Sequence, residues 1–324
     1  MRRFYRKLAA FCAAAATALS LAPAAARDFP TQPIRIVSGF GPGSAADVMA
    51  RLVGKQMESR LGQPVVIETH PGNSSMTAAE LVARAPADGY TLFMATVANT
   101  LNPITTHSSF DLGKDMAPVA LLGVVPNVLV AHPSVPANNL KELVALAKSK
   151  PDSLTFGSSG AGTASHLAAE IFNQRVGTRI VIVPYQGGSN QAVTDLLTGR
   201  ITLMFNVAAT LAPHVAAGEL KALAVAQAKR AAMMPNVPTL AEAGMAGYDA
   251  GIWIGLLAPA GTPASVIAKL SAAANDGLKA EAVQSALKQQ GVDPLGGTPQ
   301  EFADFIRVDI DKWTAAVTAE GGRN

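Results

Sequence analysis

The sequence contains the same alternation of apolar runs and helical segments twice, and this repeat restricts the possible folds more than any other feature. In the first copy, apolar runs with the character of strands occur at 34–40, 64–70 and 90–96. The second copy has equivalent runs at 153–156, 179–185 and 201–207. The segments TLFMATV and TLMFNVA close the two copies; they start at 91 and 202 and align without a gap, 111 residues apart. Strands that alternate with amphipathic helices predict an α/β fold, and the repeat predicts two lobes built from related βαβ-rich units.

Two long apolar segments punctuated by proline, 118–136 and 248–263, separate these units and are expected to be extended connections. The residues after 263 have the pattern of helices and would complete the first lobe. The predicted domains are a signal segment at 1–26, lobe one from 27–121 and 255–324, and lobe two from 122–254. Two lobes joined by two crossover strands would leave a cleft between them, at the strand ends where open α/β sheets bind ligands.

Each copy carries a glycine- and serine-rich loop directly after its first strand, and these loops are candidates for a binding site. They read GFGPGS at 39–44 and GSSGAGT at 157–163. A loop of this kind at the start of a helix exposes free backbone N–H groups, and the helix dipole adds partial positive charge, so the loop attracts anions. Two such loops facing each other would suit a ligand with a carboxylate at each end. The alternative is that the glycines only allow turns and the serines only cap helices, and the repetition of the loop makes this alternative weaker.

The same loops do not match the motifs of several catalytic or cofactor-binding sites. Neither has the lysine of a phosphate-binding P-loop, and Pro42 interrupts the glycine pattern of dinucleotide-binding proteins. Neither Ser158 nor Ser159 has glycines two residues before and two residues after it, as a serine-hydrolase nucleophile requires. His166 is interpreted as a packed or capping histidine, and the other histidines have no metal-site spacing. We therefore predict that the protein is not an enzyme and has no metal and no cofactor.

The first 26 residues have the pattern of a secretory signal peptide. Basic residues at positions 2, 3, 6 and 7 precede an apolar alanine-rich run that ends in AAA at 24–26. Sec export is favoured over twin-arginine export, because little of the twin-arginine motif is present. Cleavage would remove four basic residues and no acidic ones, which changes the formal charge from +3 to about −1, and would also remove the only cysteine, Cys12. We therefore expect a periplasmic protein without disulfides and without a basic surface for nucleic acid.

A series of motifs follows in order along nearly the whole mature chain. They include PIRIVSGFGPGSAADVMAR, APADGYTLFMAT, NVLVAHPSVPANNLKELVALAK, LTFGSSGAGTASHLAAEIF, VPYQGG, GELKALAVAQAKR and MPNVPTLAEAG. Together they resemble the periplasmic substrate-binding receptors of tripartite tricarboxylate transporters, the Bug-type or TctC-like proteins. This resemblance implies a two-lobed periplasmic binding protein, type II-like, whose lobes close on a small carboxylate and release it unchanged.

The resemblance also implies which residues bind the ligand. The loops at 41–47 and 158–166 would hold the carboxyl groups through backbone N–H groups, hydroxyls and ordered waters, and residues near 96–98, 185–188 and 206 would line the rest of the cleft. The candidate ligand-binding residues are Phe40, Gly41, Gly43, Ser44, Ala45, Asp47, Thr96, Ala98, Ser158, Ser159, Gly160, Thr163, His166, Tyr185, Gly187 and Asn206. Asp47 has a plainer interpretation as a partner of the helix dipole and the loop, and Trp253 as a core residue of the hinge.

The sequence departs from the pattern of that family at three places. Ser44 replaces a second glycine in the first loop, and the segment at 71–75 has less glycine than is usual there. Asn206 stands where the family often has aspartate, so a ligand ammonium group loses a carboxylate partner and an anionic ligand meets less repulsion. We therefore expect a carboxylate without an amine, such as an organic or aromatic acid, rather than an amino acid.

Three functions remain open on the sequence. The ligand could be delivered to the membrane permease subunits of a tripartite tricarboxylate transporter, or the closed form could be recognised by a membrane sensor, because both roles need the same cleft. A secreted serine hydrolase that uses Ser158 or Ser159 with His166 is a third function, and the missing nucleophile motif argues against it. The protein is expected to be a monomer with no nucleic-acid partner.

Overall fold

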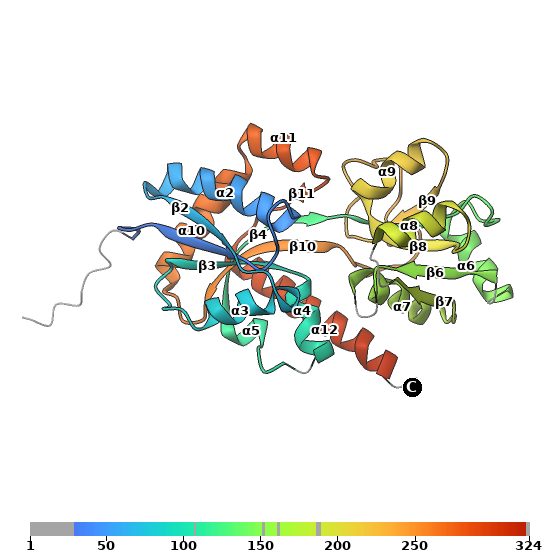
Figure 1. The fold of residues 1–324 in the computed structure, drawn as a ribbon, viewed down its shortest axis with the longest axis horizontal. Coiled ribbons are helices and arrows are strands. Elements are labelled where there is room, and N and C mark those ends of the chain that lie inside the picture. The colour runs from blue at the N-terminus through green and yellow to red at the C-terminus, as the bar shows by residue number, and fades with distance from the viewer. Residues whose placement is uncertain (1–28, 107, 151–152, 161–162, 186–188, 322–324) are drawn as a thin grey trace, which may run out of the picture.

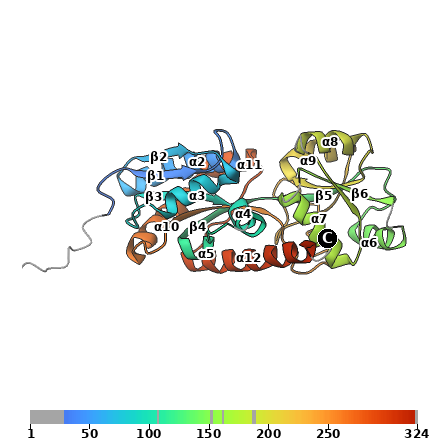
Figure 2. The ribbon, with the colours of Figure 1, turned by 60° about the horizontal axis from the view of Figure 1, so that its bottom comes forward.

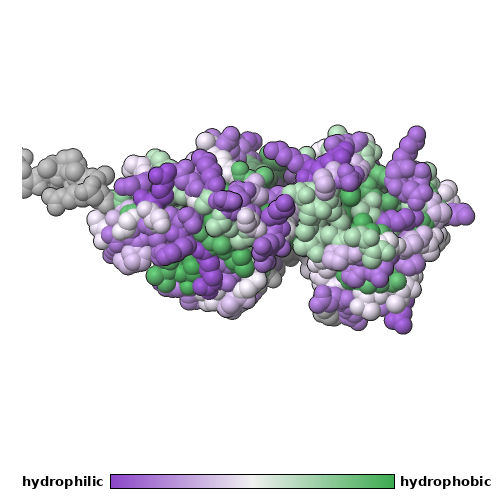
Figure 3. Space-filling model, turned by 90° about the horizontal axis from the view of Figure 1, so that it is seen from above, coloured by the Kyte–Doolittle hydropathy of each residue, from purple (hydrophilic) through white to green (hydrophobic). Residues whose placement is uncertain are grey.

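The computed structural model describes residues 29–321 except 107, 151–152, 161–162 and 186–188, so the expected signal segment at 1–26 and Gly187 lie outside the described residues. The described chain forms two α/β lobes, each built on its own sheet, and the molecule narrows between them (Figures 1 and 3). The predicted two-lobed α/β architecture is confirmed.

Lobe one is built from the start and the end of the chain. Its N-terminal elements are β1 (Ile34–Ser38), α2 (Ala45–Leu61), β2 (Val65–Thr69), the short 3₁₀ helix η1 (Asn73–Ser75), α3 (Met76–Ala83), β3 (Thr91–Thr96), α4 (Ala98–Thr106), α5 (Leu112–Asp115) and β4 (Met116–Val125). Its C-terminal elements are β10 (Ile252–Pro259), α10 (Ala264–Leu278), α11 (Glu281–Gln289), β11 (Asp293–Pro294) and α12 (Pro299–Gly321).

Lobe two is built from the middle of the chain. Its elements are β5 (Asn127–Ala131), α6 (Leu140–Ser149), β6 (Thr155–Ser158), α7 (Ala164–Val176), β7 (Val181–Pro184), α8 (Ser189–Leu197), β8 (Leu203–Val207), α9 (Ala208–Ala216) and β9 (Lys221–Val225).

The two sheets share one arrangement of strands, as the repeat in the sequence predicts. The strand order in lobe one is β11-β4-β10-β3-β1-β2, and the order in lobe two is β7-β6-β8-β5-β9. In each lobe the first strand lies between the second and third strands and runs parallel to both. An antiparallel strand, β10 or β5, then pairs with the third strand, β3 or β8. The carboxyl ends of β1, β3, β6 and β8 therefore carry the loops that the sequence singled out.

Local chemistry explains where the two helices after those loops begin and end. The Ser44 hydroxyl caps α2 by accepting a hydrogen bond from the Asp47 N–H, and the Thr163 hydroxyl caps α7 by accepting one from the His166 N–H. Both helices end at a glycine in the left-handed conformation, Gly62 with φ 70° and Gly177 with φ 70°. Both hydroxyls therefore cap helices, which is the alternative role that the sequence allowed for the loop serines and threonine.

Two connections cross between the lobes. The segment 118–136 was expected to be one extended connection, but Pro126, which lacks an N–H, separates β4 in the first sheet from β5 in the second. The second connection ends at β10, which pairs with β4 from Ile252 opposite Val125. The Asn127 side chain ties the connections together by donating a hydrogen bond of 2.8 Å to the Ala250 carbonyl.

Helix α12 adds a third link between the lobes that the sequence did not indicate. It packs against β4 and α4 in lobe one and against α7 in lobe two, and Figure 2 shows it running below both. Its residue Asp309 accepts hydrogen bonds from the indole N–H of Trp253 at 2.7 Å and of Trp313 at 3.0 Å. Both tryptophans are fully buried, as expected for Trp253 in the hinge core. One hydrophobic core therefore continues from lobe one through the hinge into lobe two.

Candidate functional site

One cavity of about 610 Å³ lies where the two lobes and the hinge strands meet. Its walls come from the β1–α2 loop, the end of β3, helix α4, the hinge strands and the start of α7. The lining residues are Phe40, Ser44, Ala45, Ala46, Thr96, Val97, Ala98, Leu101, Asn102, Thr106, Val125, Thr163, Ala164, Ile252 and Ile254. Of the residues predicted to bind ligand, the cavity brings together Phe40, Ser44, Ala45, Thr96, Ala98 and Thr163.

Three helices begin at the wall of this cavity. Ala45, Ala98 and Ala164 are the first residues of α2, α4 and α7, and all three line it. The first N–H groups of a helix have no partner inside the helix, and the helix dipole places partial positive charge at this end. Three helix starts at one cavity, two from lobe one and one from lobe two, therefore create a site that favours an anion.

The remaining wall is largely apolar. Hydrocarbon side chains of Val97, Leu101, Val125, Ile252 and Ile254 contribute to it, together with the ring of Phe40. The polar side chains at the wall are neutral, and among the described residues that line the cavity none is charged. The site can thus hold negative charge near the helix starts and a hydrocarbon or aromatic body against the hinge.

Asp47 stabilises the lobe-one loop and does not line the cavity. Asp47 is 2% exposed, and its Oδ2 accepts hydrogen bonds from the Gly43 N–H at 2.9 Å and from Arg51 Nε at 3.1 Å. Burial opposes ionisation of this carboxyl, but the hydrogen bonds from Arg51 and Gly43 and the charge of Arg51 together lower the pKa of Asp47 below its ordinary value. The bond to Gly43 also fixes that residue at φ +83°, a conformation that favours glycine.

Hydroxyl groups of the lobe-two loop form a network around the start of α7. Ser159 Oγ lies 2.9 Å from Ser165 Oγ and donates a hydrogen bond of 3.2 Å to Thr163 Oγ1. The Thr163 hydroxyl in turn donates a hydrogen bond of 2.7 Å to the Gly160 carbonyl. Among the described residues of lobe two, Thr163 and Ala164 line the cavity, whereas Ser159 and Gly160 do not.

Ser158 and His166 are brought together, at 3.3 Å between the serine Oγ and the histidine Nδ1. Ser158 is fully buried and His166 is 8% exposed, and neither lines the cavity. A serine nucleophile must reach its substrate, and this hydroxyl is covered. The arrangement agrees with the interpretation of His166 as a packed residue of the loop.

Four other predicted site residues are not part of the cavity wall. Gly41, Gly43, Tyr185 and Asn206 do not line it. The Tyr185 hydroxyl donates a hydrogen bond of 2.9 Å to Asp195. Burial raises the pKa of Tyr185, and the neighbouring Asp195 carboxylate raises it further. Asn206 is 6% exposed; its Oδ1 accepts a hydrogen bond from the Val207 N–H, while its Nδ2 has no partner among the described residues. A buried donor without a partner is available to a group that enters later.

The sequence motifs do not mark the residues of the apolar wall as part of a site. Val125, Ile252 and Ile254 belong to the crossing segments, and Leu101 and Asn102 belong to α4. The sequence does contain a signal for the crossing residues. Strands that join two lobes must pass the base of the cleft between them, so the two proline-punctuated crossing segments could have been expected to line it. Helix α4 was not assigned from the sequence, since Pro103 stands inside it.

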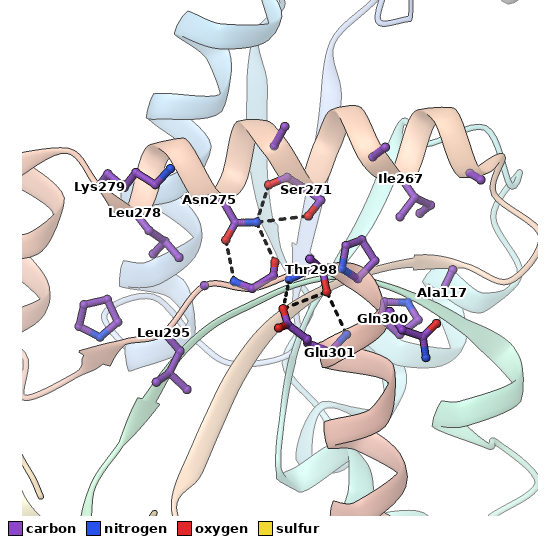
Figure 4. Close-up of a pocket in the computed structure, with 18 of the residues that line it drawn as sticks. Ala117, Ile267, Ser271, Asn275, Leu278, Lys279, Leu295, Thr298, Gln300 and Glu301 are labelled. Atoms are coloured by element: carbon purple, nitrogen blue, oxygen red, sulfur yellow. Dashed lines mark hydrogen bonds between the residues drawn. The ribbon is translucent and has the colours of Figure 1, made fainter. Parts of the chain in front are cut away.

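A second, larger cavity of about 970 Å³ lies in lobe one between α10 and the segment that leads into α12 (Figure 4). The polar groups at its centre bind one another. Asn275 donates hydrogen bonds to the Ser271 and Gly297 carbonyls and accepts one from the Gly297 N–H, and Glu301 accepts two from Thr298. The Asn275 bonds tie α10 to the segment before α12, and the Thr298–Glu301 bonds cap the start of α12, so these polar groups hold the local structure together.

Two related α/β lobes, a two-strand hinge and an anion-favouring cavity between them define a solute-binding receptor of the periplasmic binding-protein class. The chain belongs to the tripartite tricarboxylate transporter family of receptors, whose family model, "Tripartite tricarboxylate transporter family receptor", matches residues 49–321. It is 33% identical to protein BugT of Bordetella pertussis over an alignment of 311 residues that covers 95% of each chain. The predicted family is confirmed, and the chain is a binding receptor rather than an enzyme.

Solved structures agree with this assignment. A TctC solute-binding protein from Polaromonas, solved with no ligand, is 25% identical and superposes with a TM-score of 0.84 over 90% of this chain and 99% of that one. A protein of R. palustris solved with adipate is 33% identical and superposes with a TM-score of 0.71 over 91% of this chain and 99% of that one. Among the described residues, no helix is both long and apolar enough to span a membrane.

Proposed function

We propose that this protein binds a small carboxylate in the cavity between its lobes and delivers it to the membrane permease of a tripartite tricarboxylate transporter. The single observation that carries the proposal is the convergence of the starts of α2, α4 and α7 on one cavity whose described lining residues include no charged side chain. Export by the segment at 1–26, followed by its removal, would place the receptor in the periplasm.

The conformation supports a mechanism of closure. The chain superposes better on the relative solved with no ligand, with a TM-score of 0.84, than on the one solved with adipate, with a TM-score of 0.71, although the latter is more similar in sequence. We take the structure as the open form, in which the lobe-one loop lines the cavity and the described part of lobe two contributes Thr163 and Ala164. A ligand that touches both loops would stabilise the closed form, and rotation of lobe two would bring Ser159, Gly160 and the unpartnered donor of Asn206 toward it.

The lining favours a carboxylate with an apolar body and no amine. An ammonium group needs an anionic partner, and the described lining residues offer none. The hydrocarbon wall formed by Val97, Leu101, Val125 and the hinge strands would instead cover a methylene chain or an aromatic ring. A few charge-assisted hydrogen bonds of roughly 1.5–3 kcal/mol each, after ordering costs, give micromolar affinity.

Calorimetric titration of the mature protein tests the proposal. Adipate and benzoate serve as acids with an apolar body, and aspartate serves as the amino-acid comparison. The variant Ala98→Trp fills the cavity and should abolish heat of binding, while Ala272→Trp, the same change at an exposed alanine of the second cavity, should leave it intact. Tighter binding of aspartate than of adipate would contradict the ligand class, and unchanged binding in Ala98→Trp would contradict the site.

Delivery to a permease requires a separate experiment. The receptor would be used to capture detergent-solubilised membrane proteins in the presence and absence of bound ligand. Ligand-dependent recovery of the permease subunits supports transport. Recovery of a sensor protein in their place would replace transport with signalling.

A further inference from the structure

A second set of contacts joins the lobes away from the cavity. Asp293 of β11, in lobe one, accepts a hydrogen bond of 3.1 Å from the side-chain Nε2 of Gln227 and one of 3.3 Å from the N–H of Ala232. Both donors belong to the lobe-two segment that follows β9. Gln227 is 3% exposed, so this contact is built into the interface rather than made by a loose surface side chain.

The lobes also approach closely at Gly291, two residues before Asp293. Gly291 has φ +65°, and a Cβ placed on it would lie 2.8 Å from the Ala209 Cβ and 3.2 Å from the Met233 sulfur, both of lobe two. Helix α11 and β11 thus face α9 and the neighbouring loop (Figure 1). We call the contacts of Gly291 and Asp293 with Ala209, Gln227 and residues 232–233 the interlobe clasp.

The strand order places this clasp across the hinge from the binding loops. In lobe one the order is β11-β4-β10-β3-β1-β2, and the crossing connections leave from β4 and β10. The clasp lies at the β11 edge, on one side of those two strands. The β1–α2 loop and the end of β3, which hold the candidate ligand residues, lie on the other side. Rotation of lobe two about the hinge strands therefore cannot close both sides at once.

We propose that the interlobe clasp stabilises the open receptor and sets its ligand affinity from outside the cleft; this inference rests on the proposed function. When lobe two rotates to close the cavity, its 227–233 segment moves away from Asp293, and the two hydrogen bonds and the Gly291 contacts are lost. The ligand has to offset that loss before the closed form dominates. A weaker clasp gives a receptor that is closed more often without ligand and that binds more tightly.

The size of the effect follows from the population of the closed form. When that form is a minor state, the apparent dissociation constant falls in proportion to the rise in its population. Loss of two partly exposed hydrogen bonds to a carboxylate predicts a decrease of roughly five- to tenfold. Asp293→Ala removes both bonds, and Gln227→Ala removes one and should produce a smaller decrease.

A wedge variant tests the same geometry without removing a hydrogen bond. Ala209→Leu enlarges the lobe-two side chain that meets Gly291 and should push the lobes apart at the clasp, which closes the cleft. Asp304→Ala is the matched control, because it removes an exposed carboxylate of α12 whose partners, Arg307 and Gln300, lie on the same helix. Thermal unfolding of each variant establishes that it is folded.

The experiment has two readouts on the mature protein. Small-angle X-ray scattering without ligand measures the radius of gyration, which should fall for Asp293→Ala and Ala209→Leu relative to wild type and to Asp304→Ala. Adipate titration measures the dissociation constant, which should fall in the same variants. An unchanged or larger radius together with unchanged affinity would overturn the clasp. A smaller radius in a protein that binds no carboxylate would keep the clasp and refute the proposed function.

Discussion

The buried carboxylate of Asp309 allows the most quantitative prediction, because it connects the crossing strand β10 to helix α12 at the hinge. Asp309 is 2% exposed and accepts hydrogen bonds from the indoles of Trp253 and Trp313, and it forms an ion pair with Lys312. Trp253 belongs to the crossing strand β10, whereas the other two residues belong to α12. Asp309→Ala therefore separates the crossing strand from the helix that links the lobes.

The cost can be worked from these contacts. Removal of one partner of a buried ion pair costs about 3–5 kcal/mol. The Lys312 side chain is 20% exposed and can be hydrated after the ion pair is lost, so the cost of breaking this ion pair is at the low end of that range. The two indole N–H groups are fully buried and would be left without an acceptor, at about 1–3 kcal/mol each. These contributions are not additive within one cluster, and we expect a total loss of about 4 kcal/mol.

Urea unfolding followed by tryptophan fluorescence measures this loss, with the linear dependence on denaturant giving the free energy of unfolding. Asp311→Ala, at an exposed position of the same helix, is the control and should change the free energy by less than about 0.5 kcal/mol. A loss below about 1 kcal/mol in Asp309→Ala would refute the view that this carboxylate organises the hinge.

Three further predictions concern the loops and the hinge. Asp47→Asn should make the stability of the protein less sensitive to low pH. Because folding lowers the pKa of Asp47, this carboxylate stabilises the folded protein fully above its ordinary pKa of 3.8, and the contribution is lost as the pH falls through the lower pKa of the folded state. The melting temperature of wild type should therefore fall more between pH 6 and pH 3 than that of the variant. Thr163→Val should cost about 1 kcal/mol of stability by urea unfolding and weaken adipate binding roughly tenfold by calorimetry, because the hydroxyl caps α7 and the residue lines the cavity; unchanged values in both assays would remove Thr163 from the site. Adipate should change the tryptophan emission of wild type, since both tryptophans lie at the hinge and closure rearranges it; an unchanged spectrum at saturating adipate would argue against hinge motion.

The sequence predicts the strands of both lobes well, because each is an apolar run bounded by glycine, proline or polar residues. The predicted strand at 34–40 is observed at Ile34–Ser38, and that at 201–207 is observed at Leu203–Val207. The short strand β11 and the bridging role of α12 could not be predicted, because both depend on contacts between segments far apart in the chain. Local patterns contain no information on such pairing.

In the site, too, features set by local sequence are predictable, and features set by tertiary contacts are not. Ser44 and Thr163 belong to the glycine- and serine-rich loops, which the sequence alone marks as candidates, and both line the cavity. The roles of Asp47 and Ser158 depend on burial, which local sequence does not reveal: the first bonds to Arg51 and Gly43, and the second is covered. The apolar wall was missed for a related reason, since an apolar residue in a strand has the same appearance in sequence whether it faces the core or a cavity.

The central claim is that an acid sits between the lobes, at the helix starts, in a closed form of the receptor. A crystal structure of the mature protein with adipate measures this most directly. We predict a carboxylate within hydrogen-bond distance of backbone N–H groups at the start of α2 or α7, with the methylene chain against the hinge strands. Adipate bound instead in the groove between α10 and α12, with the cavity between the lobes empty, would contradict the account.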